Sequence, residues 1–292
     1  MYIVYILTNY NKILGNGNYL RCLEIKKNIS KNFKTKLLKI DDKTNFKKEK
    51  INTANCFIID IPNLSSSLLE KLKKFKKENI FIDYFGNAKV KNNILIYNHS
   101  IKKRTFSLSN SIIREEFFKY AKIIRQRKKL RINVVIILGS YDLKKYNQKV
   151  VNLLLKNSDV KLNIELITKN IKDKIFFEKK RYKQKIKIHF DKKNIAKIIH
   201  QSQIVISNGG TSCLEALYLK KIVIALGQNE QEKTFVRYLK SKNYIYGVNL
   251  SDITNLLRTN IDDVKAKLKF ANVGNGINKI TKLLKKYESY QN

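Results

Sequence analysis

Residues 203–231 constrain the fold of this chain more than any other stretch. They begin with a short apolar run at 204–206, pass through a polar turn into a helix-like segment, and end in a second apolar run at 222–226. Two buried strands joined through a helix are typical of a parallel β-α-β unit, because parallel strands need a crossover connection. We therefore expect a parallel sheet flanked by helices.

The turn between this first strand and its helix has a composition suited to anion binding. Gly209 and Gly210 remove side chains from a place where a ligand can approach the backbone, and Thr211 and Ser212 follow them. The free N–H groups at the start of a helix favour an anion, most often a phosphate. The same residues also suit a tight turn in which a hydroxyl caps the helix. The turn by itself leaves both interpretations open.

Strand and helix patterns alternate in two sets along the chain. The first set predicts strands at 2–8, 34–40, 55–60 and 80–83, followed by an irregular stretch at 84–110 and a helix at 111–125. The second predicts strands at 133–138, 161–168, 185–189, 204–206 and 222–226, a weaker one at 244–248, and closing helices at 251–258 and 261–286. A charged segment near 126–131 separates the sets. We predict an α/β chain with two doubly wound domains, residues 1–128 and 129–292, facing a cleft.

The composition fits a folded protein with a strong positive charge. With 292 residues and 43% hydrophobic content, the chain is long enough for two cores. Its formal charge of +38 favours phosphate-rich partners such as nucleic acid. However, only nine of the 61 basic residues are arginine, and the lysines occur in nearly every segment, a bias typical of an AT-rich genome. We therefore do not expect a nucleic-acid partner, although such a field attracts any anionic ligand.

Several other classes of protein are disfavoured by the sequence. No apolar stretch approaches the roughly 18–20 residues of a transmembrane helix, and the apolar N-terminus lacks the basic region and cleavage site of a signal peptide, so we expect a cytoplasmic protein. The three cysteines and three histidines are widely spaced, so we expect neither a disulfide framework nor a metal site. Nothing in the sequence indicates an oligomeric state.

Two acidic residues stand at the ends of predicted strands in the first domain. Asp60 closes the strand at 55–60 and Asp83 the strand at 80–83. The carboxyl ends of parallel strands form the edge where open α/β sheets bind ligands. A cap on the following helix or turn is an equally common use of an acid at this position.

Four segments together resemble one known family. Residues 15–23 (GNGNYLRCL) are similar to its G-x-G-H-x-x-R-C-L loop, and residues 109–117 (SNSIIREEF) to its YALLRxEF segment. Residues 138–142 (LGSYD) resemble its FGGSDP turn, and residues 203–231 resemble ISxGGxTxxEALxLGxPxIxIxLxxNQ. The family is the UDP-2,4-diacetamido-2,4,6-trideoxy-β-L-altropyranose hydrolase of pseudaminic acid synthesis, within the GT-B glycosyltransferase superfamily.

The resemblance implies a fold, a reaction and a substrate. The fold is GT-B, with two Rossmann-like domains: the first on the sugar or acceptor side, the second binding the UDP-sugar. The reaction is hydrolysis of a UDP-diacetamido-trideoxyhexose, with release of UDP, in the synthesis of a surface polysaccharide. It implies no cofactor and no metal, because the helix start and backbone N–H groups stabilise the leaving diphosphate.

The resemblance also assigns residues to the nucleotide. Gly209, Gly210, Thr211 and Ser212 would hold the diphosphate, in agreement with the anion-binding interpretation of the turn. Glu215 matches the acid that GT-B proteins use on the ribose hydroxyls. An acid in the first turn of a helix is also favoured by the helix dipole, so a purely structural role for Glu215 stays open.

A second set of residues is assigned to the sugar. Gln228 and Asn229 fall where the family has the ENQ residues that face the sugar, although they also suit a helix cap. Gly17 and Arg21 lie in the loop and helix after the first strand and match the family's G-x-G-H-x-x-R pattern. Arg21 otherwise suits a solvated position on the helix surface.

The main departure from the family is at Asn18. The family has a histidine here, which acts as the base on the attacking water. An amide does not accept a proton near neutral pH, so a contribution of about 10²- to 10⁴-fold must come from another group. Asn18 can still orient a water or a sugar hydroxyl. Asp60 and Asp83 are the candidates for the replacement base.

Four functions therefore remain open from the sequence. The first is a UDP-sugar hydrolase, and the second is a GT-B glycosyltransferase that passes the sugar to an acceptor hydroxyl. The third is a nucleotide-sugar binder without catalysis, and the fourth is a nucleic-acid binder driven by charge. Each function has its own readout. A hydrolase releases free sugar, and a transferase passes the sugar to an acceptor. A binder holds UDP without turnover, and a nucleic-acid binder shows steeply salt-dependent binding.

Overall fold

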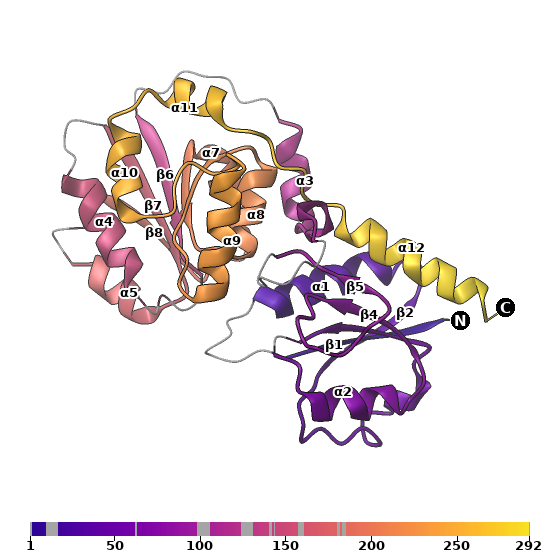
Figure 1. The fold of residues 1–292 in the computed structure, drawn as a ribbon. Helices are drawn as coiled ribbons and strands as arrows, with labels where there is room; N and C mark the ends of the chain where they lie inside the picture. Colours follow the sequence, from indigo (N-terminus) through magenta and orange to yellow (C-terminus); the bar gives the residue numbers. More distant parts are fainter. Residues whose placement is uncertain are drawn as a thin grey trace. The chain divides into compact units, whose positions relative to one another are not determined.

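The computed structural model describes residues 2–9, 17–61, 63–97, 106–123, 131–139, 142, 144–156, 161–179, 182 and 185–291. Backbone contacts divide the chain into two compact units (Figure 1). Unit 1 comprises residues 1–113 and 273–292, and unit 2 comprises residues 114–272. The chain therefore leaves unit 1 after Ile113 and returns to it at Val273.

Unit 1 contains a sheet of five parallel strands in the order β2-β1-β3-β4-β5. Its elements are β1 (Ile3–Thr8), α1 (Gly17–Ile29), β2 (Lys34–Lys39), the 3-10 turn η1 (Ile51–Thr53), β3 (Cys56–Asp60), α2 (Ser66–Lys73), β4 (Glu78–Ile82), β5 (Asn93–Ile94), the 3-10 turn η2 (Leu108–Asn110) and α12 (Gly276–Ser289).

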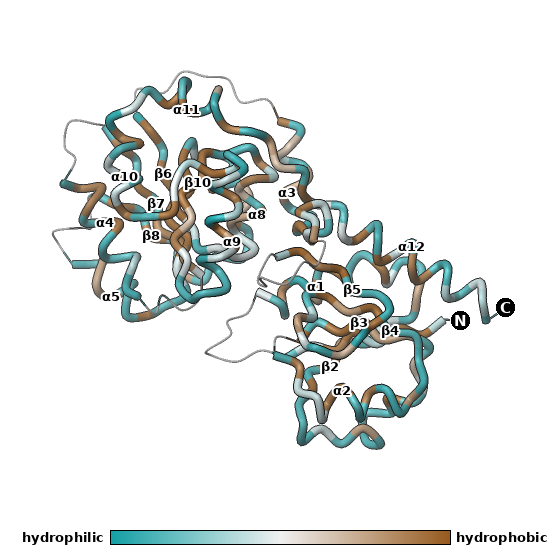
Figure 2. The backbone as a smooth tube through the Cα atoms, viewed as in Figure 1, coloured by the Kyte–Doolittle hydropathy of each residue, from teal (hydrophilic) through white to brown (hydrophobic). Residues whose placement is uncertain are grey.

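The central strands β1 and β3 are buried on both faces, which explains their nearly continuous apolar runs. Tyr5, Leu7 and Phe57 pack with the leucines of α2 in one core. Helices α1 and α12 lie on the opposite side of the sheet (Figure 1). Figure 2 shows the central strands mostly brown and the loops mostly teal, so apolar residues concentrate inside the layers.

Helix α12 closes unit 1 through several specific contacts. Asn275 donates its backbone N–H to the Ser109 carbonyl at 2.8 Å, and Gly274 donates to the Ser111 hydroxyl at 2.9 Å. A Cβ at Gly276 would lie 2.1 Å from the Asn110 carbonyl oxygen, so only glycine permits this approach. The last helix of the chain is therefore an integral part of the first unit.

Unit 2 contains a second sheet of five parallel strands, in the order β10-β9-β6-β7-β8. Its elements are α3 (Glu115–Ala121), β6 (Ile132–Ile137), α4 (Tyr146–Lys156), β7 (Leu162–Thr168), α5 (Ile171–Phe177), β8 (Ile186–Phe190), α7 (Ala196–Gln201), β9 (Ile204–Ser207), α8 (Thr211–Tyr218), β10 (Ile222–Ala225), α9 (Glu230–Ser241), α10 (Leu250–Leu257) and α11 (Ile261–Lys267).

Helices cover both faces of the second sheet. Apolar residues of α4, α5, α10 and α11 form one core with alternate residues of the strands, such as Val134, Ile136 and Leu166. Helices α7 and α8 pack near β6, β9 and β10, and α3 packs against α7 and α8 (Figure 1). Both units are thus doubly wound, and the predicted α/β class with two Rossmann-like domains is confirmed.

The structure refines the predicted element limits. The weak strand predicted at 244–248 is only an isolated bridge between Gly247 and Ile224, and the irregular stretch after β4 contains the short strand β5. The single helix predicted at 261–286 is two helices, α11 and α12, and α12 belongs to unit 1. The predicted boundary at residues 128 and 129 lies outside the described residues. Backbone contacts begin unit 2 at Arg114, so α3 belongs to unit 2.

Across the described ranges, every helix is too short or too polar to span a lipid bilayer.

Candidate functional site

The two sheets reverse strand order at different places, and each reversal defines a ligand-binding edge. In unit 2 the reversal lies between β6 and β9, and in unit 1 between β1 and β3. Ligands of open α/β sheets bind outside the carboxyl ends of the strands at such a switch point. The turn at 208–212 follows β9, and Asn18, Arg21 and Asp60 lie at the switch point of unit 1. The structure therefore presents one candidate cluster in each unit.

The turn after β9 leads directly into helix α8. Gly210 is the N-cap residue, in extended conformation, and no side chain caps the helix there. Thr211 and Ser212 are the first helical residues, so the predicted capping by their hydroxyls is wrong. The first N–H groups of a helix have no acceptor inside it. This helix start therefore retains the donors and the dipole that bind an anion.

The two glycines of the turn have different reasons to be glycine. A Cβ on Gly209 would lie 2.9 Å from Val236 Cγ1 and 3.1 Å from Glu232 Cβ, so Gly209 lets α9 pack closely. The nearest neighbour of a Cβ on Gly210 would be the Asn208 side chain, at 3.2 Å. Of the two, Gly210 is the position where a missing side chain keeps the helix start accessible.

Glu232 joins this turn to the next loop, and the sequence analysis did not identify it. Its carboxylate accepts hydrogen bonds from the Gln228 backbone N–H at 2.9 Å and from Asn208 Nδ2 at 2.8 Å. It also accepts from the Gly209 backbone N–H, and burial raises its pKa. One half-buried carboxylate thus fixes the loop after β9 and the loop after β10 together.

The side chains of Gln228 and Asn229 both make hydrogen bonds within the protein. Asn229 is the N-cap of α9 and accepts the Glu232 backbone N–H at 2.8 Å. The Gln228 side chain donates to the Leu138 carbonyl at 2.6 Å, at the carboxyl end of β6. Gly139 follows there with φ +84°, in the left-handed region that favours glycine. The structure therefore gathers the loops after β6, β9 and β10 at one edge of the sheet.

Glu215 lies inside unit 2 and is fully buried. Its two carboxylate oxygens accept hydrogen bonds from Arg114 Nε at 2.6 Å and Nη2 at 2.8 Å. Arg114 immediately precedes α3 and also lies 3.0 Å from Glu116. Glu215 is therefore the partner of an arginine from another motif, and a ribose would reach it only if Arg114 moved away.

In unit 1, Arg21 connects the two predicted acids. Its guanidinium donates to both oxygens of Asp60, each at 2.7 Å, and to Asp83 Oδ2 at 3.0 Å. All three side chains are at least nine-tenths buried. Arg21 also lies over the Tyr97 ring, 5.9 Å from its centroid. The alternative interpretation of Arg21 as a solvated helix residue is wrong, because the guanidinium points inward at the carboxyl ends of β3 and β4.

The two carboxylates differ in their environment. Asp83 Oδ1 accepts the backbone N–H groups of Ile96 and Tyr97 at 2.7 and 3.3 Å. Burial raises the pKa of Asp83 to about 6, although Arg21 opposes this shift. Asp60 accepts from Arg21 on both oxygens and from the Cys22 thiol at 3.6 Å. The protonation of Asp83 therefore changes near pH 6.

Asn18 is buried at the start of α1, one residue after the exposed Gly17. Its amide nitrogen donates to Thr8 Oγ1 at 3.1 Å, to the Asp60 carbonyl at 3.4 Å and to the Asn9 carbonyl. These contacts tie the helix to the ends of β1 and β3. Gly15 and Asn16 of the same motif lie outside the described residues, as do Ser140 and Tyr141 of the later turn.

The cysteines do not provide a reactive thiol. Cys22, Cys56 and Cys213 are all free and buried. Burial raises the pKa of each thiol, that of Cys213 to about 12. The thiolate forms are therefore disfavoured. Among the described residues, no group of three metal-binding side chains comes together.

Comparison with known proteins places the chain among GT-B folds. No family model matches the sequence. Among solved structures, MurG of Acinetobacter baumannii superposes with a TM-score of 0.66 at 11% identity, over 98% of this chain and 100% of that one. UDP-GlcNAc 2-epimerase of Methanocaldococcus jannaschii, in complex with UDP-GlcNAc and UDP, gives a TM-score of 0.56 at 11% identity, over 98% and 100%. The fold is GT-B.

Two curated proteins are similar in sequence. "Uncharacterized protein MJ1062" of Methanocaldococcus jannaschii is 30% identical over 244 residues, which cover 78% of this chain and 49% of that protein. The UDP-2,4-diacetamido-2,4,6-trideoxy-β-L-altropyranose hydrolase of Campylobacter jejuni is 27% identical over 136 residues, covering 47% and 48%. The chain spans about half the length of the curated relatives it matches.

Proposed function

We propose that this chain binds a UDP-sugar and hydrolyses the bond between the sugar and the diphosphate. The substrate class is a UDP-diacetamido-trideoxyhexose of the kind used for pseudaminic acid-type surface glycans. Unit 2 holds the UDP, and unit 1 carries the predicted catalytic carboxylates. The sequence similarity to the Campylobacter jejuni hydrolase supports this choice of substrate.

The observation that carries the proposal is the uncapped start of α8. It lies at the switch point of a doubly wound sheet, with Gly210 as its N-cap, and no side chain in the described part of the chain makes a capping hydrogen bond to it. A diphosphate is the natural ligand of such a helix start, because donors and dipole act on the same negative charge. Glu232 holds this turn in one geometry before any ligand arrives.

In the proposed reaction, water attacks the anomeric carbon of the sugar. The bond from that carbon to the diphosphate oxygen breaks, and UDP leaves with the electron pair. The helix start of α8 stabilises the negative charge that develops on the diphosphate. The water proton passes to a carboxylate. We assign this step to Asp83, because its pKa of about 6 keeps it both ionised and basic near neutral pH.

Asn18 has a positioning role in this proposal. Its amide nitrogen already serves three acceptors around the start of α1. It therefore fixes the helix that carries Arg21, and Arg21 in turn fixes both carboxylates. Gly17 lies at the exposed start of the same helix, where the absence of a side chain leaves room for a sugar.

A second candidate function follows from the same contacts. Asp83 is paired with Arg21, whose charge opposes the rise of the Asp83 pKa on burial and so works against its role as a base. A GT-B glycosyltransferase or a non-catalytic nucleotide-sugar binder would keep the UDP site of unit 2 and need no base for water. Transfer to an acceptor hydroxyl is the stronger of these alternatives, because the UDP-sugar is then consumed in one step.

The deciding experiment incubates the purified full chain with the UDP-diacetamido sugar and, in parallel, with UDP-GlcNAc. Chromatography follows UDP and free sugar, and calorimetry measures UDP binding. Equal amounts of UDP and free sugar support the hydrolase. UDP binding without release supports the second candidate, which is then tested with added acceptors. Failure to bind UDP would exclude both.

A further inference from the structure

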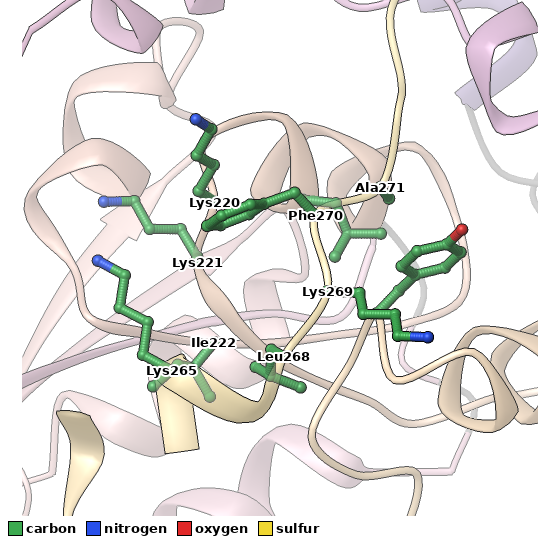
Figure 3. Close-up of a pocket in the computed structure, with 10 residues that line it drawn as sticks. Lys220, Lys221, Ile222, Lys265, Leu268, Lys269, Phe270 and Ala271 are labelled. Carbon is green, nitrogen blue, oxygen red and sulfur yellow. The ribbon is translucent and has the colours of Figure 1, made fainter. Parts of the chain in front are cut away.

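A second concave surface lies at the other end of α8. It is a shallow hollow, open to solvent, between the end of α8, the start of β10 and the segment after α11. Its lining includes Lys220, Lys221, Lys265, Lys269 and Phe270 (Figure 3), and we call it the lysine pocket. Because α8 spans eight residues, or about 12 Å, the lysine pocket is separate from the turn at 208–212.

The charge of the lysine pocket has a single sign. Four of its ten lining residues are lysines, and none is an aspartate or glutamate. In Figure 3 the ammonium groups of Lys220, Lys221 and Lys265 lie in a row on one side of Phe270, whereas Lys269 points the other way. Neither Lys220, Lys265 nor Lys269 forms an ion pair with any residue in the described ranges. Like charges gathered in this way repel one another, and an anion relieves the repulsion.

Phe270 gives the lysine pocket an apolar face. Its side chain is 64% exposed, which is unusual for a large aromatic residue. The Lys220 ammonium lies 4.8 Å from the centre of its ring. A cation held beside an exposed ring forms a surface that accepts a negative group and the organic part attached to it. A phosphate ester has both parts.

Lys220 lies at the C-terminal end of α8, in a backbone conformation that favours glycine. The Lys221 N–H bonds to the Ala216 carbonyl and the Lys220 N–H to the Leu217 carbonyl, which is the Schellman pattern at a helix end. Lys220 occupies its left-handed position with φ +53°, where glycine is favoured. Lys50, Lys76 and Lys145 have similar φ values elsewhere in this glycine-poor chain. A left-handed backbone therefore does not by itself mark a binding site. It does mean that a glycine at position 220 can remove the ammonium group without weakening the fold.

We propose that the lysine pocket binds a phosphate-bearing anion, with the phosphate on Lys220 and Lys265 and the organic part on Phe270, while the Lys221 ammonium donates to the His200 carbonyl at 2.6 Å. The site is independent of the UDP site proposed above. Two sources supply this chemistry: a soluble phosphate ester and the headgroup of an anionic lipid. The shared chemistry is the phosphate group, and the experiment distinguishes the sources.

The first arm of the test measures binding of inorganic pyrophosphate to the full chain by calorimetry. The variant K220A/K265A removes two ammonium groups from the lysine pocket. The control K47A/K48A removes two exposed lysines of unit 1, so the net charge changes equally. We expect about tenfold weaker binding in the pocket variant and less than a twofold change in the control. Equal weakening in both variants, or none in either, would overturn the proposal.

A glycine substitution separates binding from stability. K220G relieves the left-handed backbone and removes one ammonium group, so we expect a higher unfolding temperature together with weaker pyrophosphate binding. UDP binding stays unchanged, because the opposite end of α8 is untouched. A K220G variant that is more stable and binds pyrophosphate like the parent chain would count against the proposal.

The second arm uses flotation with phosphatidylglycerol vesicles, with phosphatidylcholine vesicles as the uncharged comparison. Binding to the anionic vesicles that is lost in both K220A/K265A and F270A, but kept in K47A/K48A, assigns the phosphate to a lipid headgroup. The other outcome is vesicle binding that is absent or equal in all variants. If the pyrophosphate arm still distinguishes the variants, the phosphate belongs to a soluble ester. When neither arm distinguishes them, the proposal fails.

Discussion

Arg114 and Glu215 lie 101 positions apart in the sequence and form a two-point ion pair. The guanidinium donates from Nε and Nη2 to the two carboxylate oxygens, at 2.6 and 2.8 Å. Glu215 is fully buried, whereas the Arg114 side chain is 21% exposed. The pair connects the residue before α3 with the helix that starts at the anion-binding turn. It therefore attaches α3 to unit 2.

Removing the arginine should destabilise unit 2 strongly. In R114M the Glu215 carboxylate stays buried without a partner, which costs about 3 kcal/mol of unfolding free energy. Urea unfolding measures this loss, with R258M as the control for an exposed arginine. The double variant R114M/E215L leaves no stranded charge and should be more stable than R114M. Equal stability of R114M and R258M would show that the pair contributes little.

The two glycines of the turn should separate stability from ligand binding. In G209A the new Cβ meets Val236 and Glu232, so we expect a loss of about 1–3 kcal/mol. In G210A the nearest neighbour of the new Cβ is Asn208, so stability should change by less than about 1 kcal/mol. UDP binding should nevertheless weaken about tenfold in G210A. UDP titration and thermal unfolding of both variants test this, and full UDP affinity in G210A contradicts it.

Glu232 should control the shape of the same turn. E232Q keeps the size of the side chain, but its amide nitrogen faces the donors of Gln228 or Asn208, which now lack an acceptor. We expect a loss of about 1–3 kcal/mol in stability, together with weaker UDP binding. E230Q is the matched control, because Glu230 is exposed and pairs with Lys233 on the surface. Equal behaviour of the two variants would remove the positioning role of Glu232.

The raised pKa of Asp83 should affect stability at acidic pH. Its folded-state pKa is about 6, above the roughly 3.9 of an unfolded aspartate. The folded chain therefore binds the proton more tightly, and this group's contribution to stability is present below about pH 4 and lost as the pH rises to about 6. The loss is at most about 3 kcal/mol. Urea unfolding across pH 4–7 should show this slope in the parent chain and not in D83N.

The same group should shape the pH profile of catalysis. If Asp83 accepts the water proton, kcat/KM for the UDP-sugar rises with pH through about 6 and then levels off. D83N should lower kcat/KM by about 10²-fold or more, with UDP affinity unchanged. A D83N variant with the parent rate and pH profile would exclude Asp83 as the base.

The sequence predicted most of the fold, because local patterns determine it. Nine predicted strands correspond to β1–β4 and β6–β10, since buried parallel strands appear as short apolar runs. The short strand β5 was missed, because two residues carry no periodic signal. The return of α12 to unit 1 was also missed. Its apolar pattern shows that one face is buried but does not say against which sheet.

The sequence predicted where residues of the candidate site lie, but not which side chains they contact. Asp60 and Asp83 were placed at strand ends from their sequence positions, and both lie at the carboxyl edge of their sheet. Their shared partner Arg21 was not predicted, because the direction of a helix side chain depends on how the helix packs. Glu232 had a usable signal: an acid three residues after the N-cap residue Asn229 is typical of a capping box. Here the acid instead joins two loops.

The division of unit 1 has a consequence for synthesis of the chain on the ribosome. Strands β1–β5 emerge first, but α12, which covers part of their sheet, is translated after all of unit 2. Unit 2 is continuous in sequence and can complete its core while synthesis proceeds. The nascent sheet of unit 1 must therefore wait with one side incompletely covered. We expect the second half of this protein to mature before the first.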